Sequence, residues 1–406
     1  MIFLSERSLN QRTKKMLRSS FHDAVWLVVL LAVGLATFLH TTVSAQNVKT
    51  PTIMFEGMTD PSRFDSTAIC SVNADGANLK RLTADGDRIF NTSPRPQWSP
   101  DGQNIAYVNW LGGLDGGFVA VELYAMDRDG ANRRLLLHVA EHFGQRTQQI
   151  TGVAWSPDGK TLAVTRLVSG LFLVPTNVEG EPRLVLKAQS GREFSSPAWS
   201  PDGKRIAVYA YMHTAVGTGL SQISEVRVVN ADGSDDITVG ESVVQTRILQ
   251  EAVPIRWSSE GSKVFFPLMA STSGGTVAIR AYASNADGSG EMKLTGRPAY
   301  TAVSPDGSRI AFARAQPGSP KEIFVMNEDG SGVRQVTNDP DWACTTSEWS
   351  PDGKRLVLSC HFVRDPCRVA IGCNWRIFMI AADNPPTKLT PIIDRDAKYP
   401  SVAPEP

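Results

Sequence analysis

Four cysteines near the end of the chain carry the clearest chemical signal in the sequence. Cys344, Cys360, Cys367 and Cys373 fall within 30 residues of one another. Two readings fit them: a pair of disulfides, Cys344–Cys360 and Cys367–Cys373, or a metal site that also uses His361. The spacing lacks the paired C-x2-4-C pattern of zinc modules, so we predict disulfides and no metal, although sequence alone does not fix the connectivity.

A second candidate for chemistry is His138-Val-Ala-Glu141-His142, which spells the H-x-x-E-H order of a class of zinc proteases. That motif needs a helix, because positions four apart then share one face and both histidines reach one metal ion. Here it follows the apolar run Leu135-Leu136-Leu137, which is typical of a strand. We therefore expect no zinc here and no cofactor.

Other catalytic patterns are weak in this sequence. No G-x-S-x-G elbow and no glycine-rich phosphate loop occurs, and only four histidines follow residue 45. A pair of carboxylates acting on a sugar stays open, because such pairs have no sequence signature. We assign no catalytic residue from the sequence.

One phrase is repeated along the chain, and it defines the elements that must position any site. Its fullest form is Trp-Ser-Pro-Asp-Gly-Lys, and each copy is followed by an apolar run. Ser-Pro-Asp-Gly is a tight-turn sequence, since Pro presets φ and Gly accepts a positive φ. The six copies begin at Trp98, Trp155, Trp199, Trp257, Val303 and Trp349.

A second turn, of the Asn-Ala-Asp-Gly type, follows most copies and is a strong hairpin signal. Each unit therefore predicts four antiparallel strands, and units of this length that repeat predict an all-β propeller. We expect each Trp to fill the space between neighbouring blades. A ligand or calcium role for the repeated Trp and Asp residues is the alternative, and their presence in every unit argues for structure.

The count of units predicts seven blades. Six complete units begin at Gln97, Val153, Pro197, Ile255, Ala302 and Glu348. A further unit from Thr52 to Thr83 lacks its first strand, and residues 399–404 are a degraded copy of that strand. The C-terminus would then complete the N-terminal blade and close the ring, which removes two exposed strand edges. Six blades are the alternative.

The short turns lie on one face of such a propeller, so the longer connections, among them Tyr211–Ser224, fall on the other face. Variable loops on a rigid scaffold are where binding usually resides, and aromatic residues anchor interfaces. We therefore predict binding on this long-loop face or at the mouth of the axial channel, with packing of the loops as the alternative role. The candidate binding residues are Phe64, Trp110, Tyr211, His213, Trp342 and Trp375.

The first 45 residues read as a secretory signal peptide. A basic segment precedes an uncharged apolar stretch at residues 24–39, and Val43-Ser44-Ala45 fits a cleavage site. An uncleaved anchor is the alternative, so we expect membrane contact only if this segment is retained. Residues 46–406 would form the propeller, in the periplasm or outside the cell. Disulfides agree with that compartment. Cys70 is left over and reads as a buried strand thiol.

Net charge is formally zero, and the part after residue 45 has no basic run, so a nucleic-acid partner is not expected. We expect a monomer. The repeated Trp-Ser-Pro-Asp-Gly-Lys with later Asn-x-Asp-Gly and Leu-Thr resembles the TolB-like, or PD40, branch of WD40-like propellers. The match covers residues 52–406, and the chain departs from the family's namesake in having seven predicted blades rather than six.

That resemblance implies an exported propeller that works by binding. The same repeat also serves in peptidases and in some polysaccharide lyases. The sequence therefore predicts a non-catalytic propeller that binds a protein or cell-envelope ligand on its long-loop face. The alternative is an enzyme that acts on a polysaccharide or glycan at the channel mouth.

Overall fold

The computed structural model describes most of the chain beyond residue 50. The chain divides into two compact units, Met1–Thr50 and Pro51–Pro406. The predicted signal segment lies outside the described residues, and no helix within the described part is long and apolar enough to cross a membrane. The described residues are 51–58, 67–83, 87, 95–112, 118–140, 149–177, 180–189, 191–216, 219–244, 254–271, 277–290, 292–295, 299–315, 320–363, 375–393 and 397–404.

Residues 51–406 form seven antiparallel sheets, which we number as blades 1 to 7. Blade 1 has the order β27-β1-β2-β3, and each later blade uses strands in chain order. The strands of blades 1 to 3 are β27 (Ala397–Val402), β1 (Thr52–Met58), β2 (Thr67–Asn73), β3 (Lys80–Arg81), β4 (Gln97–Trp98), β5 (Asn104–Gly112), β6 (Phe118–Asp127), β7 (Arg134–Ala140), β8 (Ile150–Trp155), β9 (Thr161–Arg166), β10 (Gly170–Pro175) and β11 (Arg183–Lys187). The strands of blades 4 to 7 are β12 (Arg192–Trp199), β13 (Arg205–Val216), β14 (Gly219–Asn230), β15 (Ile237–Val244), β16 (Arg256–Trp257), β17 (Lys263–Ser271), β18 (Val277–Asn285), β19 (Met292–Thr295), β20 (Ala299–Val303), β21 (Arg309–Ala315), β22 (Lys321–Asn327), β23 (Arg334–Gln335), β24 (Trp342–Trp349), β25 (Arg355–Phe362) and β26 (Trp375–Ala381).

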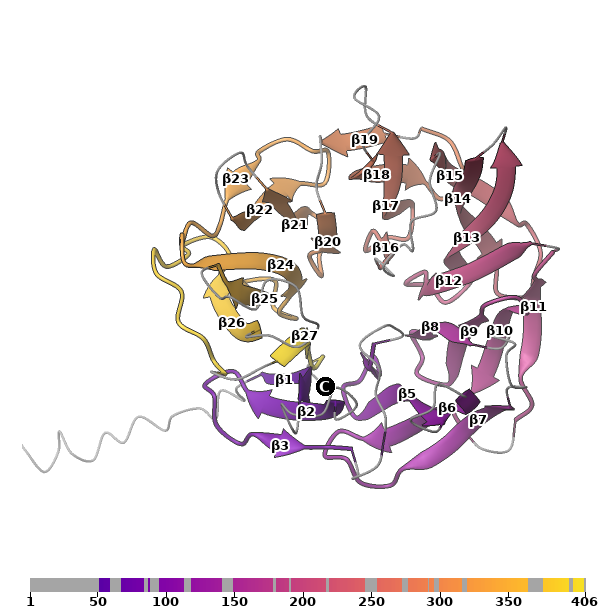
Figure 1. Ribbon diagram of the computed structural model, residues 1–406, viewed down its shortest axis with the longest axis horizontal. Helices are drawn as coiled ribbons and strands as arrows, with labels where there is room; N and C mark the ends of the chain where they lie inside the picture. The colour runs from indigo at the N-terminus through magenta and orange to yellow at the C-terminus, as the bar shows by residue number, and fades with distance from the viewer. Residues whose placement is uncertain are drawn as a thin grey trace, which may run out of the picture. The chain divides into compact units, whose positions relative to one another are not determined.

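The seven blades surround a central axis, as Figure 1 shows, and the fold is the predicted seven-bladed β-propeller. The C-terminal strand closes the ring, because β27 pairs with β1 through Ile53 opposite Val402 and Gly57 opposite Ala397. Blade 7 has three named strands in the described part, and an isolated bridge between Ile377 and Ile393 extends it.

The repeated phrase forms the same turn each time, and the first copy shows its physical basis. The Ser99 hydroxyl donates to Asp101 Oδ1 at 2.6 Å and accepts from the Asn104 backbone N–H at 2.8 Å. Gly102 has a φ of +64°, which an L side chain rarely adopts. The Ser99 hydrogen bond lowers the pKa of Asp101, followed by the bond from the Gln103 N–H, so the charged carboxylate holds the turn.

The hydrophobic core lies in the seams between neighbouring blades. In the seam of blades 1 and 2, Met54 and Ile69 from one blade pack with Trp98, Ile105 and Tyr107 from the other. Each blade therefore buries its apolar surface only against its neighbours, which agrees with the repeat reading of the sequence.

The predicted bounds of some long connections are wrong. Tyr211–Ser224 was expected to be a loop, but β13 continues to Val216 and β14 begins again at Gly219. The two strands pair along this whole length, from Arg205 opposite Asn230 to Val216 opposite Gly219. Backbone pairing in a long hairpin satisfies the polar groups that a loop would leave to water, so the strands extend past the blade.

Candidate functional site: the axial channel

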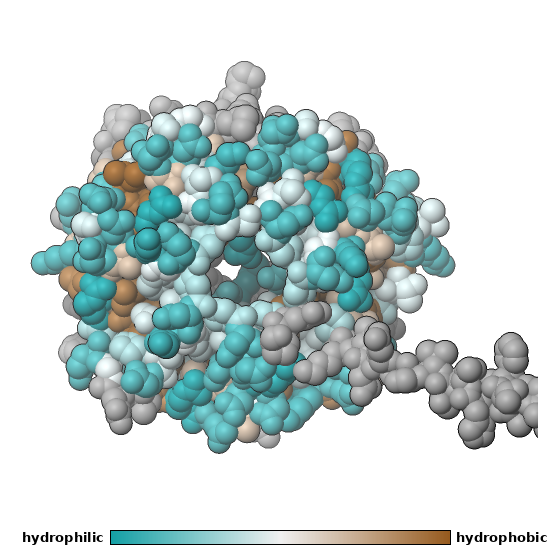
Figure 2. Space-filling model, turned by 180° about the vertical axis from the view of Figure 1, so that it is seen from behind, coloured by the Kyte–Doolittle hydropathy of each residue, from teal (hydrophilic) through white to brown (hydrophobic). Residues whose placement is uncertain are grey.

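The innermost strand of each blade lines the axis, and the wall of the axial pocket comes from these strands. The pocket has a volume of about 420 Å³. Seen from behind, Figure 2 shows a hollow at the centre of the ring bordered by hydrophilic residues. The residue just before the Trp of the repeat, or before the residue in its place, reaches the pocket from six blades: Gln97, Ala154, Ala198, Arg256, Glu348 and Ser401.

The repeat tryptophans hold this ring of residues in place. Trp155 Nε1 donates to the Gln97 carbonyl at 3.1 Å, and Trp257 Nε1 donates to the Ala198 carbonyl at 2.9 Å. Trp98 and Trp349 make the equivalent bonds to Ser401 and Ala302, at 3.4 and 3.0 Å. In each case the acceptor is the residue of the preceding blade that stands just before the repeat Trp, or before the residue in its place. The predicted role of Trp between blades is therefore confirmed, and it also fixes the backbone of the channel wall.

Trp199 departs from this pattern. Its Nε1 is buried and has no hydrogen-bond partner within the described part of the chain. The two blades of this seam approach closely at Gly152 instead, because a Cβ on Gly152 would lie 2.3 Å from Pro197 Cδ. Only a glycine fits that approach. Blades 3 and 4 thus approach closely at Gly152, without the indole bond seen in four of the other seams.

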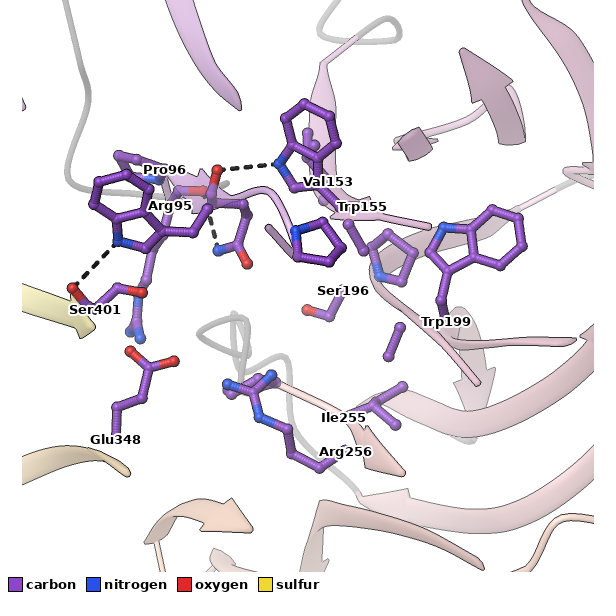
Figure 3. A pocket seen from close by; sticks show the side chains of 18 of the residues that line it. Arg95, Pro96, Val153, Trp155, Ser196, Trp199, Ile255, Arg256, Glu348 and Ser401 are labelled. Carbon is purple, nitrogen blue, oxygen red and sulfur yellow. Dashed lines mark hydrogen bonds between the residues drawn. The ribbon is translucent and has the colours of Figure 1, made fainter. Parts of the chain in front are cut away.

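Three charged side chains converge in the pocket, and they are the only charged residues among its described lining. Arg95 comes from the segment before β4, Arg256 from β16 and Glu348 from β24. Figure 3 shows both guanidinium groups directed toward the Glu348 carboxylate. All three side chains are partly buried. The formal charge of the group is one positive unit when all three are ionised.

Burial in the pocket wall shifts the pKa values of Glu348 and Arg256. Burial raises the pKa of Glu348, and Arg256 is the largest influence that lowers it, followed by hydrogen bonds from the Ser401 hydroxyl and the Val402 N–H and by Arg95. Burial lowers the pKa of Arg256, which the charge of Glu348 opposes and that of Arg95 reinforces. The carboxylate and the guanidinium groups therefore stabilise one another's charged forms in a desolvated space.

Prolines dominate the rest of the wall. Pro96, Pro197, Pro254 and Pro400 lie on or beside the innermost strands and line the pocket. Proline has no backbone N–H, so these positions offer only carbonyl acceptors. The charged hydrogen-bond donors of the described lining are then the two arginines, beside neutral donors such as Ser196 and Gln97.

The predicted aromatic binding residues that the structure describes lie on strands of blades 2, 4 and 7 rather than in loops. Trp110, on β5, is 7% exposed and packs in the seam of blades 2 and 3. Tyr211, on β13, stacks on Tyr209 with ring centroids 5.9 Å apart, and its hydroxyl lies 2.7 Å from Ser195 Oγ. Burial raises the pKa of Tyr211 well above its usual value. These contacts show a packing role, and binding by these residues stays a prediction.

Blade 7 carries two of the predicted aromatic residues, one on each face of its sheet, because their partners Phe362 and His361 are consecutive on β25. Trp342 meets Phe378 edge-on at 4.9 Å and Phe362 at 5.4 Å. Trp375 pairs with His361 across β25 and β26, with ring centroids 4.8 Å apart. We call Trp342, His361, Phe362 and Trp375 the blade-7 aromatic group; all four are partly buried. Phe64 lies outside the described residues, as does the side chain of His213.

The structure bears on the other candidate residues as well. The predicted Cys344–Cys360 disulfide is present, and it joins residues directly opposite in the β24–β25 pair. Cys367 and Cys373 lie outside the described residues. Cys70 is partly buried on β2 and packs beside the cluster between blades 7 and 1.

His138 belongs to a strand, β7, where its Nδ1 lies 3.1 Å from Glu122 Oε1. Glu141 and His142 lie outside the described part. The H-x-x-E-H motif needs its first histidine on a helix, and His138 is extended instead.

Sequence reasoning missed the charged residues of the channel, although a signal for them existed. The position before the repeat Trp is occupied by Ala154, Ala198 and Ala302 in three copies, but by Arg256 and Glu348 in two others. A charged side chain at a position that holds alanine in three copies indicates a role other than packing. Once the phrase is aligned, that departure points to the axis.

Comparison with known proteins agrees with this architecture. The family model "WD domain, G-beta repeat" matches residues 136–170. The chain is a seven-bladed β-propeller, and one segment of it is similar to a WD repeat. The predicted likeness to WD40-like propellers agrees with this match and with the seven blades of the fold. No curated protein matches the propeller's sequence.

Several solved structures resemble this propeller at low identity. An oligogalacturonate lyase in complex with manganese is 17% identical, with a TM-score of 0.54, over 83% of this chain and 83% of that one. A puromycin-hydrolyzing peptidase from Mycobacterium tuberculosis is 13% identical, with a TM-score of 0.55, over 84% of this chain and 53% of that one. A putative TolB from Agrobacterium tumefaciens is 19% identical, with a TM-score of 0.42, over 66% and 86%. At these identities the likeness shows the fold alone.

Proposed function

We propose that this chain is an exported, non-catalytic propeller that binds a protein or cell-envelope ligand on its long-loop face. The observation that carries this proposal is the blade-7 aromatic group, in which Trp342 contacts Phe362 and Trp375 contacts His361 while all four side chains stay partly exposed. Aromatic side chains held in this way lose little conformational entropy when a partner covers them. The Cys344–Cys360 disulfide supports export, since such bonds persist in oxidising compartments.

Trp375 is the residue to test, because it begins β26 and its ring contacts His361. In a pull-down with residues 46–406, the Trp375→Ala variant should capture at least tenfold less of a cell-envelope partner than the wild-type chain does. Leu135→Ala is the matched control, because Leu135 is a 40% exposed apolar residue on the outer strand of blade 2. Equal capture by the two variants would count against a binding role for this face.

A second candidate function has an observation of its own. The convergence of Arg95, Arg256 and Glu348 in the axial pocket is the arrangement expected of an enzyme that acts on a polysaccharide or glycan. One structural neighbour is an oligogalacturonate lyase. Incubation with a panel of acidic and neutral polysaccharides, followed by analysis of chain length, tests it. Cleavage that Glu348→Gln abolishes would favour the enzyme, and intact polymers throughout would exclude it.

A further inference from the structure

The axial pocket has a charge balance and a set of hydrogen-bonding groups that together select a ligand. Its three charged residues carry one net positive charge, so a ligand with a single negative charge would neutralise the site. A phosphate dianion would leave excess negative charge beside Glu348 in a desolvated space, where like charges repel strongly. The site therefore favours a monocarboxylate.

Arg256 is the group that most needs such a ligand. Burial, Glu348 and Arg95 shift the pKa of Arg256, but its guanidinium donates no hydrogen bond to any residue in the described part of the chain. A guanidinium carries five N–H donors in a planar fork, which matches the two oxygens of a carboxylate. A ligand anion therefore finds its strongest donor on Arg256, and Arg95 adds a second positive charge to the described lining.

Glu348 supplies the complementary acceptor. The Ser401 hydroxyl and the Val402 N–H donate to its carboxylate and hold it in one orientation. The oxygen lone pairs that remain face the pocket and can accept a hydrogen bond from a ligand hydroxyl. The volume of about 420 Å³ falls within the range of small-molecule sites.

We propose that the axial channel binds a small hydroxylated monocarboxylate, whose carboxylate contacts Arg256 and Arg95 and whose hydroxyl donates to Glu348. This site is separate from the blade-7 aromatic group, and the inference does not depend on binding there. Binding of the carboxylate should also change the protonation of Glu348. A bound carboxylate takes up the positive charge that now offsets the burial of Glu348, so the pKa of Glu348 rises further and binding is accompanied by proton uptake.

Calorimetric titration of residues 46–406 with gluconate tests the proposal. Sorbitol is the matched neutral probe, because it replaces the carboxylate with a hydroxymethyl group, and inorganic phosphate is the competing anion. Gluconate should bind, sorbitol should not, and Arg256→Gln should weaken gluconate binding by about tenfold or more. Arg183→Gln is the control, since Arg183 is an exposed arginine on the outer strand β11. Arg256→Lys keeps the charge but not the fork and should retain part of the affinity.

Repeating the titration in buffers with different ionisation enthalpies measures the protons taken up. The wild-type chain should take up a fraction of a proton per gluconate, and Glu348→Gln should bind without that uptake. Circular dichroism and the melting temperature confirm that each variant is folded. Equal binding of gluconate and sorbitol, unchanged affinity in Arg256→Gln, or binding of phosphate alone would each overturn the assignment.

Discussion

Two tryptophans that begin identical repeat phrases allow the free-energy contribution of one inter-blade hydrogen bond to be measured. Trp155 and Trp199 both begin Trp-Ser-Pro-Asp-Gly-Lys. Trp155 Nε1 donates to the Gln97 carbonyl at 3.1 Å, whereas Trp199 Nε1 is buried with no partner in the described part. Replacing each by Phe removes the same atoms from the same local sequence. The difference between the two variants therefore isolates the inter-blade hydrogen bond.

The expected magnitudes follow from what each replacement leaves behind. Trp155→Phe loses a bond and leaves the Gln97 carbonyl without its donor, which costs about 1–2 kcal/mol beyond the loss of packing. Trp199→Phe removes a buried N–H that already lacks an acceptor, so it bears only the packing loss. Trp155→Phe should therefore be less stable than Trp199→Phe by about 1–2 kcal/mol.

Urea denaturation followed by far-ultraviolet circular dichroism measures the free energy of unfolding of both variants. Trp257→Phe provides a repeat of the first case, because Trp257 donates to the Ala198 carbonyl at 2.9 Å. If Trp155→Phe and Trp199→Phe lose the same stability within about 0.3 kcal/mol, the hydrogen bonds to the ring residues do not hold the blades together. The tryptophans would then act through their volume alone.

Two further predictions concern ring closure and pH. Deletion of residues 397–406 removes β27 and exposes the edge of β1, so the melting temperature should fall sharply; an unchanged melt would contradict closure by this strand. Burial raises the pKa of Glu322 to about 7, an effect that a hydrogen bond from Thr337 opposes and the charge of Asp339 reinforces. The folded state thus keeps a proton that the unfolded state has released, so the stability supplied by Glu322 is full below pH ~4.5 and is lost as the pH rises through 7, on the order of 3 kcal/mol in total. Glu322→Gln should flatten that part of the stability–pH curve, and an unaltered slope would show that another group titrates there.

The fold was predictable because its determinants are local and repeated. Ser99, Asp101 and Gly102 build their turn from contacts within six residues, and the Ser–Asp contact recurs in the four other Ser-Pro-Asp-Gly copies. Even the closing strand was visible, because residues 399–404 repeat the phrase in degraded form. The strand bounds were less predictable. The β13–β14 hairpin runs to Val216 and Gly219 through backbone pairing that carries no turn residues to mark it.

The channel site was not predictable in the same way, because it is assembled by ring closure. Arg95, Arg256 and Glu348 are far apart in the sequence and belong to blades 2, 5 and 7. No local pattern says that their side chains face one another, since that depends on how many blades complete the circle. The aromatic residues led the sequence analysis to predict a site on the long-loop face. Some of these residues, such as Trp110, fill a seam between blades instead.

The pairing of β27 with β1 sets an order for the maturation of the chain. The sheet that is synthesised first is the last to be finished, because its innermost strand is encoded by residues 397–402. A polypeptide threaded N-terminus first through a membrane pore would emerge with that sheet incomplete until nearly all of it had crossed. Throughout that interval the vacant edge invites association with other nascent strands, and a chaperone that shields it would be of most use then.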